Sequence, residues 1–105
     1  MSSPKRPRTD RRIAERKAKD LVRAKERLFL VEPGGAREHP IEVTSTSVIE
    51  IRVEQLPCVQ CETAMYRIRE HVSVETGLRR LDVICRNCGA PRSLWFRIVE
   101  PPEPN

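Results

Sequence analysis

Apolar residues recur with helical spacing between residues 9 and 30, and they predict an amphipathic helix. At about 100° per residue, eight apolar side chains fall on one half of a helical wheel. They are Ile13, Ala14, Ala18, Leu21, Val22, Ala24, Leu28 and Phe29. Thr9 can cap the start of this helix, and Pro33-Gly34-Gly35 follow its end. We therefore expect a helix over residues 9–30, between a disordered basic tail over residues 1–8 and a linker over residues 31–40.

The period changes to two after the linker, which predicts β-strand structure. Apolar and small residues at odd positions form one face from Ile41 to Val53, and polar residues occupy most of the other face. One long bent strand, or two strands broken at Ser45-Thr46-Ser47, fits this alternation. Both forms remain open, and we expect strand structure over residues 41–54.

A β-hairpin and a final strand are predicted further along the chain. Alternation returns on both sides of a turn at residues 75–78 and again before the C-terminal prolines. The alternating segments are residues 66–74, 81–85 and 94–98. The expected fold class is a small β-rich domain over residues 41–100, built on an antiparallel three-stranded sheet. The strand material of residues 41–54 would extend this sheet, and residues 101–105 form a short polar tail.

Four cysteines provide the strongest chemical signal in the chain. Two residues separate Cys58 from Cys61, two separate Cys85 from Cys88, and 23 residues lie between the two pairs. A two-residue gap lets both sulfurs of a tight turn reach one ion, at about 2.3 Å for zinc. The insertion is long enough for the hairpin that the alternation predicts independently. The prediction is one structural zinc ion bound by four thiolates.

Other uses of these cysteines fit the sequence less well. A thioredoxin-like redox pair needs an α/β context, and two disulfides suit a secreted protein, for which the chain shows no signal peptide. A rubredoxin-like iron site uses the same four thiolates and remains the open alternative for the metal. Because protein ligands would fill all four coordination positions, no site for a catalytic water remains, and we expect no enzymatic activity.

The cysteine motifs resemble those of the zinc-ribbon superfamily. The matching residues are Pro57-Cys58-x-x-Cys61 and Cys85-x-x-Cys88-Gly89. This superfamily includes ribbons of transcription factors and ribosomal proteins, so the resemblance implies a zinc ribbon over residues 56–99 and a zinc-binding role for the four cysteines. Glu62 stands where the family commonly has glycine, which predicts a distorted first turn. The hairpin tip at residues 75–78 lacks the adjacent Asp-Glu pair of transcript-cleavage ribbons, which argues against a cleavage factor.

Positive charge is concentrated at the N-terminal end. Residues 1–28 hold eleven Lys and Arg against four acids, a net charge of +7, whereas residues 29–105 have a net charge of −2. Five basic residues form a narrow stripe on the predicted helix, away from its apolar half: Arg12, Arg16, Lys19, Arg23 and Arg27. Such a stripe either follows the phosphates of DNA or RNA or is simply solvated, and both readings remain open.

Trp95 lies in the last predicted strand, beside Arg97 and on the opposite face from Phe96. An exposed Trp–Arg pair can stack a nucleic-acid base. Core packing is the preferred reading, because large apolar residues are few in this chain. The expected contacts of Trp95 are Ile49, Ile51 and Val53.

Together these features predict a non-catalytic, zinc-binding cytoplasmic protein that acts as an accessory factor associated with nucleic acid, a ribosome or a polymerase. Residues 1–28 would contact DNA or RNA, and the ribbon would contact a protein. The alternative is a protein–protein adaptor that docks through the apolar helix face of Ile13, Leu21 and Leu28, and an iron electron carrier is a more distant one. No apolar run approaches the length of a membrane span, so a membrane is not an expected partner. The sequence shows no Ser-His-Asp set, phosphate-binding glycine loop or paired carboxylates, so a small-molecule substrate is not expected either.

Overall fold

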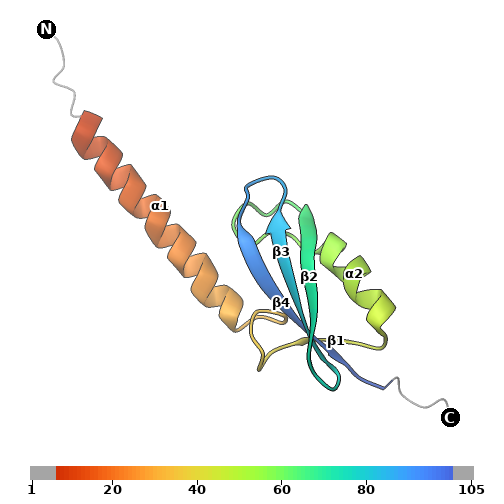
Figure 1. The fold of residues 1–105 in the computed structure, drawn as a ribbon. Helices are drawn as coiled ribbons and strands as arrows, with labels where there is room; N and C mark the ends of the chain where they lie inside the picture. The colour runs from red at the N-terminus through yellow and green to blue at the C-terminus, as the bar shows by residue number, and fades with distance from the viewer. Residues whose placement is uncertain (1–6, 101–105) are drawn as a thin grey trace, which may run out of the picture.

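The computed structural model describes residues 7–100, where two helices accompany one four-stranded sheet (Figure 1). The elements are α1 (Pro7–Leu30), β1 (Ile41–Val43), α2 (Thr46–Gln55), β2 (Tyr66–Glu75), β3 (Leu78–Cys85) and β4 (Pro91–Ile98). The strand order is β1-β4-β3-β2; β3 is antiparallel to both β2 and β4, and β1 is parallel to β4. Residues 1–6 of the expected N-terminal tail, and the whole tail expected over residues 101–105, lie outside the described residues.

One face of the sheet carries the hydrophobic core. Successive side chains of a strand point to opposite faces, so Leu94 and Phe96 of β4 share a face, on which Leu81 of β3 lies directly opposite Leu94. Ile49 and Val53 of α2 belong to the same cluster and have no exposed surface. Burial of each such side chain contributes roughly 1.5–3 kcal/mol, which holds α2 against the sheet.

The expectation of strand structure over residues 41–54 is wrong for most of that segment. Only its first three residues form a strand, and most of the remainder forms α2. Ile49 and Val53 are buried and Leu56 is partly buried, whereas Ile51 is 56% exposed. A helix places residues four apart on one face, which explains this burial pattern. Tertiary packing has overridden the strand propensity of a segment rich in valine, isoleucine and threonine.

The expected extension of the three-stranded sheet is present, but only as the short strand β1. β1 joins the edge of this sheet in parallel to β4, with Ile41 opposite Phe96 and Val43 opposite Ile98. Parallel pairing needs a long connection that returns the chain to the same end of the sheet, and here α2, β2 and β3 lie within that connection. Local alternation cannot reveal such a pairing, because the paired residues are far apart in the sequence.

Trp95 lies outside the main core. Its neighbours Leu94 and Phe96 are buried in the cluster with α2, whereas Trp95 is half-buried on the other face of β4. The expected packing of Trp95 against Ile49 and Val53 is therefore wrong, because α2 covers the opposite face of the sheet.

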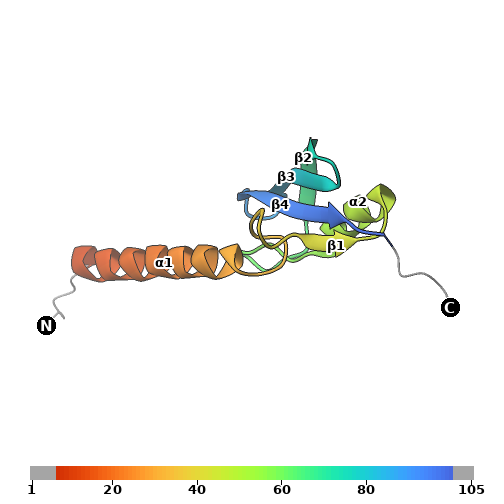
Figure 2. The same ribbon diagram turned by 90° about the horizontal axis from the view of Figure 1, so that it is seen from below.

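Helix α1 projects beyond the sheet for most of its length (Figure 2). Every side chain from Thr9 to Ala24 is exposed, burial begins at Lys25, and Phe29 is in the core. The helix begins at Pro7, so Thr9 is not its cap, and the expected tail does not extend to residue 8. Proline suits the first turn of a helix, where its missing N–H would have no partner in any case. Its 24 residues give α1 a length of about 36 Å.

Candidate metal centre

The structure brings the four predicted cysteines into one cluster. Their Sγ atoms all lie within 4.8 Å of one another. Two of these contacts are shorter, at 3.7 Å between Cys58 and Cys88 and 3.6 Å between Cys61 and Cys85. Four sulfurs bound tetrahedrally at about 2.3 Å from one ion are about 3.8 Å apart. The donor set and its spacing therefore fit a metal ion, and these four cysteines can hold one.

Two equivalent turns present the sulfurs. The first cysteine turn (residues 58–61) lies between α2 and β2, and the second cysteine turn (residues 85–88) lies between β3 and β4. In each, the residue after the second cysteine donates its N–H to the carbonyl of the first cysteine at 2.8 Å: Glu62 to Cys58 and Gly89 to Cys85. A second bond of 3.0 Å closes each turn, from the N–H of the first cysteine to the carbonyl five residues later. The sheet then brings the two turns together, because Cys85 at the end of β3 pairs with Tyr66 at the start of β2.

Backbone N–H groups point at the sulfurs, as a thiolate requires. The N–H of Gln60 donates to Cys58 Sγ at 3.4 Å, and the N–H of Cys88 donates to Cys85 Sγ at 3.5 Å. Burial raises the pKa of Cys58, but the N–H groups of Cys61 and Gln60 outweigh it and bring the pKa below its usual value. These donors stabilise negative sulfur, the form that binds a metal.

The pKa values of Cys61 and Cys88, the two cysteines outside the buried core, are shifted in opposite directions. The side chain of Asn87, with Nδ2 at 3.5 Å from Cys61 Sγ, and then the N–H of Thr63 lower the pKa of Cys61 to about 6. The N–H of Ala90 lowers the pKa of Cys88, but burial and the three neighbouring thiols outweigh it and raise this pKa to about 11. Metal ligation needs all four thiolates, so loading must release protons, and Cys88 holds its proton more firmly than Cys58 or Cys61.

The cluster lies at the edge of the core. Cys58 and Cys85 are each only 1% exposed and belong to the hydrophobic cluster, whereas Cys61 is half-buried and Cys88 is exposed. Tyr66 supports the first cysteine turn, because its buried hydroxyl accepts the N–H of Val59 at 3.1 Å. A bound ion would therefore tie both cysteine turns to the packed sheet.

The first cysteine turn is not distorted, although it has Glu62 at the position where the second cysteine turn has glycine. Glu62 adopts φ 64° and Gly89 adopts φ 81°, so both turns end in the same left-handed backbone conformation. Glu62 is exposed, and its N–H bond to Cys58 has the same length as that of Gly89 to Cys85. The turn keeps its shape at the cost of strain, since a non-glycine residue in this conformation costs roughly 1–2 kcal/mol.

Reciprocal substitutions at these two positions are expected to change stability in opposite directions. Gly89→Ala should lower the free energy of unfolding by about 1 kcal/mol, because strain outweighs the reduced freedom of the unfolded chain. A Cβ at Gly89 would meet no atom within 4 Å, so this loss would be purely conformational. Glu62→Gly should raise stability by up to about 1 kcal/mol. Denaturant titrations of both variants with metal in excess test this prediction. A change of the same sign in the free energy of unfolding of both variants would contradict it.

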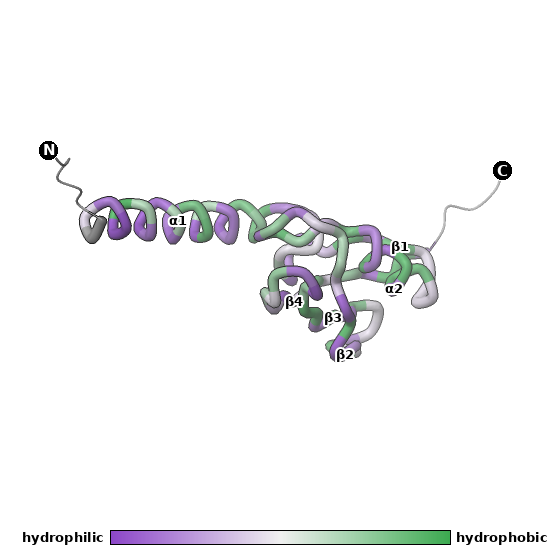
Figure 3. Tube along the Cα trace, turned by 90° about the horizontal axis from the view of Figure 1, so that it is seen from above, coloured by the Kyte–Doolittle hydropathy of each residue, from purple (hydrophilic) through white to green (hydrophobic). Residues whose placement is uncertain are grey.

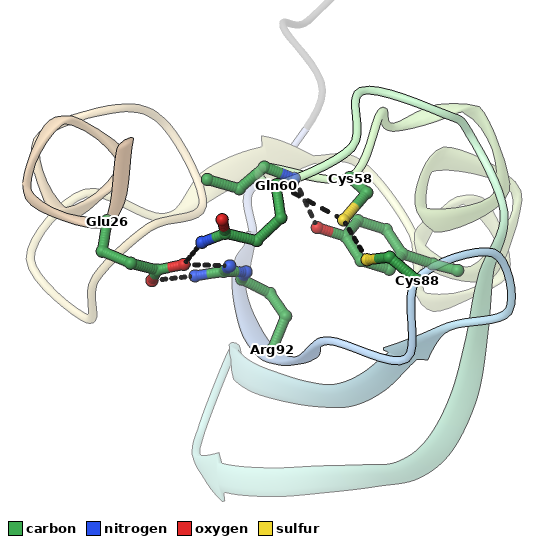
Figure 4. A network of polar contacts seen from close by, with 7 residues as sticks. Glu26, Cys58, Gln60, Cys88 and Arg92 are labelled. Carbon is green, nitrogen blue, oxygen red and sulfur yellow. Dashed lines mark hydrogen bonds and ion pairs between the residues drawn. The ribbon is translucent and has the colours of Figure 1, made fainter. Parts of the chain in front are cut away.

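Three polar residues join α1 to the first cysteine turn, and none of them was predicted from the sequence. They are Glu26 of α1, Gln60 of the turn and Arg92 of β4 (Figure 4). Glu26 and Arg92 are 66 residues apart in the chain. No local spacing can predict such a contact, because only the folded sheet brings β4 beside the end of α1.

The basic stripe runs along the projecting part of α1 and ends with Arg27 at the attached end of the helix. All five of its side chains are exposed: Arg12, Arg16, Lys19, Arg23 and Arg27. Figure 3 shows hydrophilic and hydrophobic residues alternating along α1, as expected of an amphipathic helix. Apart from the buried Phe29, the apolar half is exposed too, with 46% of Ile13, 56% of Leu21 and 60% of Leu28 accessible to solvent.

No helix within residues 7–100 combines the length and the apolar character needed to cross a membrane. No protein-family model matches this chain, and neither a curated protein nor a solved structure matches it.

Proposed function

We propose that this protein is a non-catalytic zinc-binding protein of the zinc-ribbon type that associates with nucleic acid. Helix α1 would lie along phosphates, and the sheet domain would contact a protein of the assembly, such as a polymerase or a ribosome. The observation that carries the proposal is the exposure of the whole basic stripe on a helix that projects from the domain.

Zinc is the metal that we propose for the cysteine cluster. Four thiolates in two Cys-x-x-Cys turns are a common structural zinc site, and tetrahedral geometry suits the ion. Iron binds the same donor set, so elemental analysis of protein purified without added metal must distinguish the two. We expect about one equivalent of zinc and a colourless protein, whereas a coloured, iron-containing protein would instead indicate an electron carrier.

The arrangement of the cysteines supports a structural rather than a catalytic role for the ion. Protein sulfur would occupy all four positions, so no position remains for a water or substrate. Cys58 and Cys85 belong to the hydrophobic core, so an ion bound to their sulfurs would hold these two chain segments together.

The length of the basic stripe suits a phosphate backbone. Arg12 to Arg27 span about 22 Å of helix at about 1.5 Å per residue. A nucleic-acid duplex of that length carries about six phosphates per strand. Asp20 lies 3.8 Å from Arg23 in an exposed ion pair. Such a pair contributes little to stability, so Arg23 stays available to a phosphate.

Charge reversal on α1 tests this proposal directly. Full-length protein is compared with the triple variant Arg16→Glu, Lys19→Glu, Arg23→Glu in binding to DNA and RNA between about 50 and 200 mM salt, where contacts with phosphates weaken steeply. The matched control, Arg67→Glu, Arg69→Glu, Arg86→Glu, makes the same change in net charge at exposed residues away from α1.

We expect the logarithm of the wild-type affinity to fall with log salt at a slope of about −4, at about 0.7–0.9 per phosphate contact. The α1 variant should lose most of the affinity, and its slope should be smaller by the contribution of about three phosphate contacts. The control should keep the wild-type affinity and slope. Absence of wild-type binding at about 50 mM salt, where such contacts are strongest, would refute the nucleic-acid proposal. An equal loss in the control would show that overall charge, not α1, is responsible.

A protein–protein adaptor is the second candidate, and the exposed apolar half of α1 favours it. Leu21 and Leu28 are more than half exposed on a helix that touches the domain only at its C-terminal end. Large apolar side chains gathered on one face of a helix are typical of a docking surface. Replacing both leucines by serine should abolish partner capture in a pull-down that withstands nuclease and high salt, whereas the charge-reversal variant should retain it.

A further inference from the structure

Helix α1 is attached to the sheet domain near its C-terminal end. Phe29 is 8% exposed and lies in the core, and the guanidinium of Arg92 lies 4.8 Å from the centre of its ring. Arg92 also binds the Glu26 carboxylate with two bonds of 2.5 Å. Its side chain is only 8% exposed, and the pairing lowers the pKa of Glu26 and raises that of Arg92, so both groups are charged at neutral pH. These contacts hold the helix at one place on β4.

A separate pair of contacts joins α1 to the first cysteine turn. The Gln60 side-chain amide donates to Glu26, and Lys25 Nζ donates to the backbone carbonyl of Gln60 at 2.9 Å. Gln60 lies between Cys58 and Cys61, and its own N–H donates to Cys58 Sγ at 3.4 Å. Figure 4 shows a continuous network from Glu26 through the side chain and N–H of Gln60 to the sulfurs of Cys58 and Cys88.

The two attachments have different mechanical roles. The contacts of Phe29 and Glu26 with Arg92 fall close together, so by themselves they would let the helix pivot about that place. The contacts with Gln60 add a second point of attachment, on the first cysteine turn, and restrict this rotation of the helix. Because α1 is about 36 Å long, a small rotation at this end would displace its exposed N-terminal part by several times as much as it displaces the anchor.

We infer that the metal-organised first cysteine turn fixes the direction of α1, with Gln60 as the coupling residue between the metal centre and the helix. Lys25 and Glu26 hold Gln60 only while the turn keeps its shape, and a bound ion fixes that shape through Cys58 and Cys61. If the contacts with Gln60 are lost while the ion stays bound, this second attachment is removed, and the helix and its basic stripe no longer point in one direction. The inference concerns the chain itself and holds whatever α1 binds.

Coupling of this kind is reciprocal: if the metal favours the docked helix, the docked helix favours the metal by the same factor. Lys25→Ala removes a contact with the turn but touches no metal ligand. It should weaken metal binding by about three- to tenfold, the range for loss of one such hydrogen bond. Lys17→Ala is the matched control, because it makes the same change on the exposed part of the same helix, and it should leave metal affinity unchanged.

The direction of α1 is measured in the metal-loaded full-length protein by amide ¹⁵N relaxation and residual dipolar couplings. In the wild type, residues 9–24 and β3 should share one tumbling time and one alignment. In the double variant Lys25→Ala, Gln60→Ala, the residual dipolar couplings of residues 9–24 should shrink by at least about twofold relative to those of β3. Such a reduction is expected of an element that reorients independently. Metal content and the chemical shifts of β3 should stay unchanged, which separates the effect from unfolding.

Val43→Ala serves as a control for general destabilisation. Val43 is buried in β1 away from the network, so its truncation should lower metal affinity through folding and yet leave α1 aligned with β3. The inference is overturned if α1 reorients independently of β3 in the metal-loaded wild type, or if it stays aligned in the double variant. Equal metal affinities of Lys25→Ala and Lys17→Ala would overturn it as well.

Discussion

Chelation of the metal is expected to unfold residues 50–100 in one cooperative step, and this is the largest effect that we predict. Structural zinc contributes roughly 10–16 kcal/mol in zinc-finger peptides, which equals or exceeds the roughly 5–15 kcal/mol by which whole domains are stable. Cys58 and Cys85 lie within the core, so loss of the ion would remove the link that joins the two cysteine turns to each other and to the packed sheet.

Cys85→Ser should reproduce the effect of the chelator, because it removes one of the two buried ligands. Arg86→Ala is the matched control, since Arg86 is exposed in the same turn and only its backbone N–H, which bonds the Met65 carbonyl at 2.9 Å, is used. Hydrogen exchange of β3 amides gives the readout, because β3 is paired on both sides. Protection of β3 in metal-free protein would show that the packing of α2 on the sheet is sufficient without the ion.

The second-largest effect should come from Ile49→Ala in α2. Ile49 has no exposed surface and packs in the cluster with Phe96, so its truncation leaves a cavity and should cost about 2–5 kcal/mol. Ile51→Ala is the matched control on the same helix. Its side chain is 56% exposed, so its truncation should change stability by less than about 0.5 kcal/mol. Denaturant titrations with metal in excess measure both.

This pair of variants also distinguishes the helix from the strand expected over the same residues. In a strand, Ile49 and Ile51 would share one face, and both truncations would have similar costs. In the helix, residues 49 and 53 share the buried face, and residue 51 points elsewhere. Similar losses in the two variants would therefore contradict the presence of α2.

Local patterns in the sequence are enough to predict much of the fold. The helical period of α1 and the alternation of β2, β3 and β4 depend on neighbours within one element, so a linear pattern is enough to predict them. The cysteine spacing determines two tight turns, and the hairpin between them returns the chain to the first pair. For this reason the spacing alone is enough to identify all four ligands of the candidate centre.

The segment from Ile41 to Gln55 shows where local patterns fail. Its alternation and its β-branched residues favour a strand, yet the spacing of Ile49, Val53 and Leu56 also fits a helix face. Only the sheet decides between the two, because α2 buries its side chains against Phe96 and its neighbours, which a continued strand would not reach. Strand propensity is largely a property of the environment and gives way to such packing.

The sequence by itself thus determined the amphipathic helix, the hairpin, the final strand and the cysteine cluster, because each depends on residues close in the chain or on a fixed ligand spacing. Tertiary structure alone decided that β1 pairs in parallel with β4 and that Glu26 meets Arg92 and Gln60. These features depend on surfaces that exist only after the sheet has formed. The direction of α1 belongs to this second group, since it is set by contacts between residues 35 and 66 positions apart.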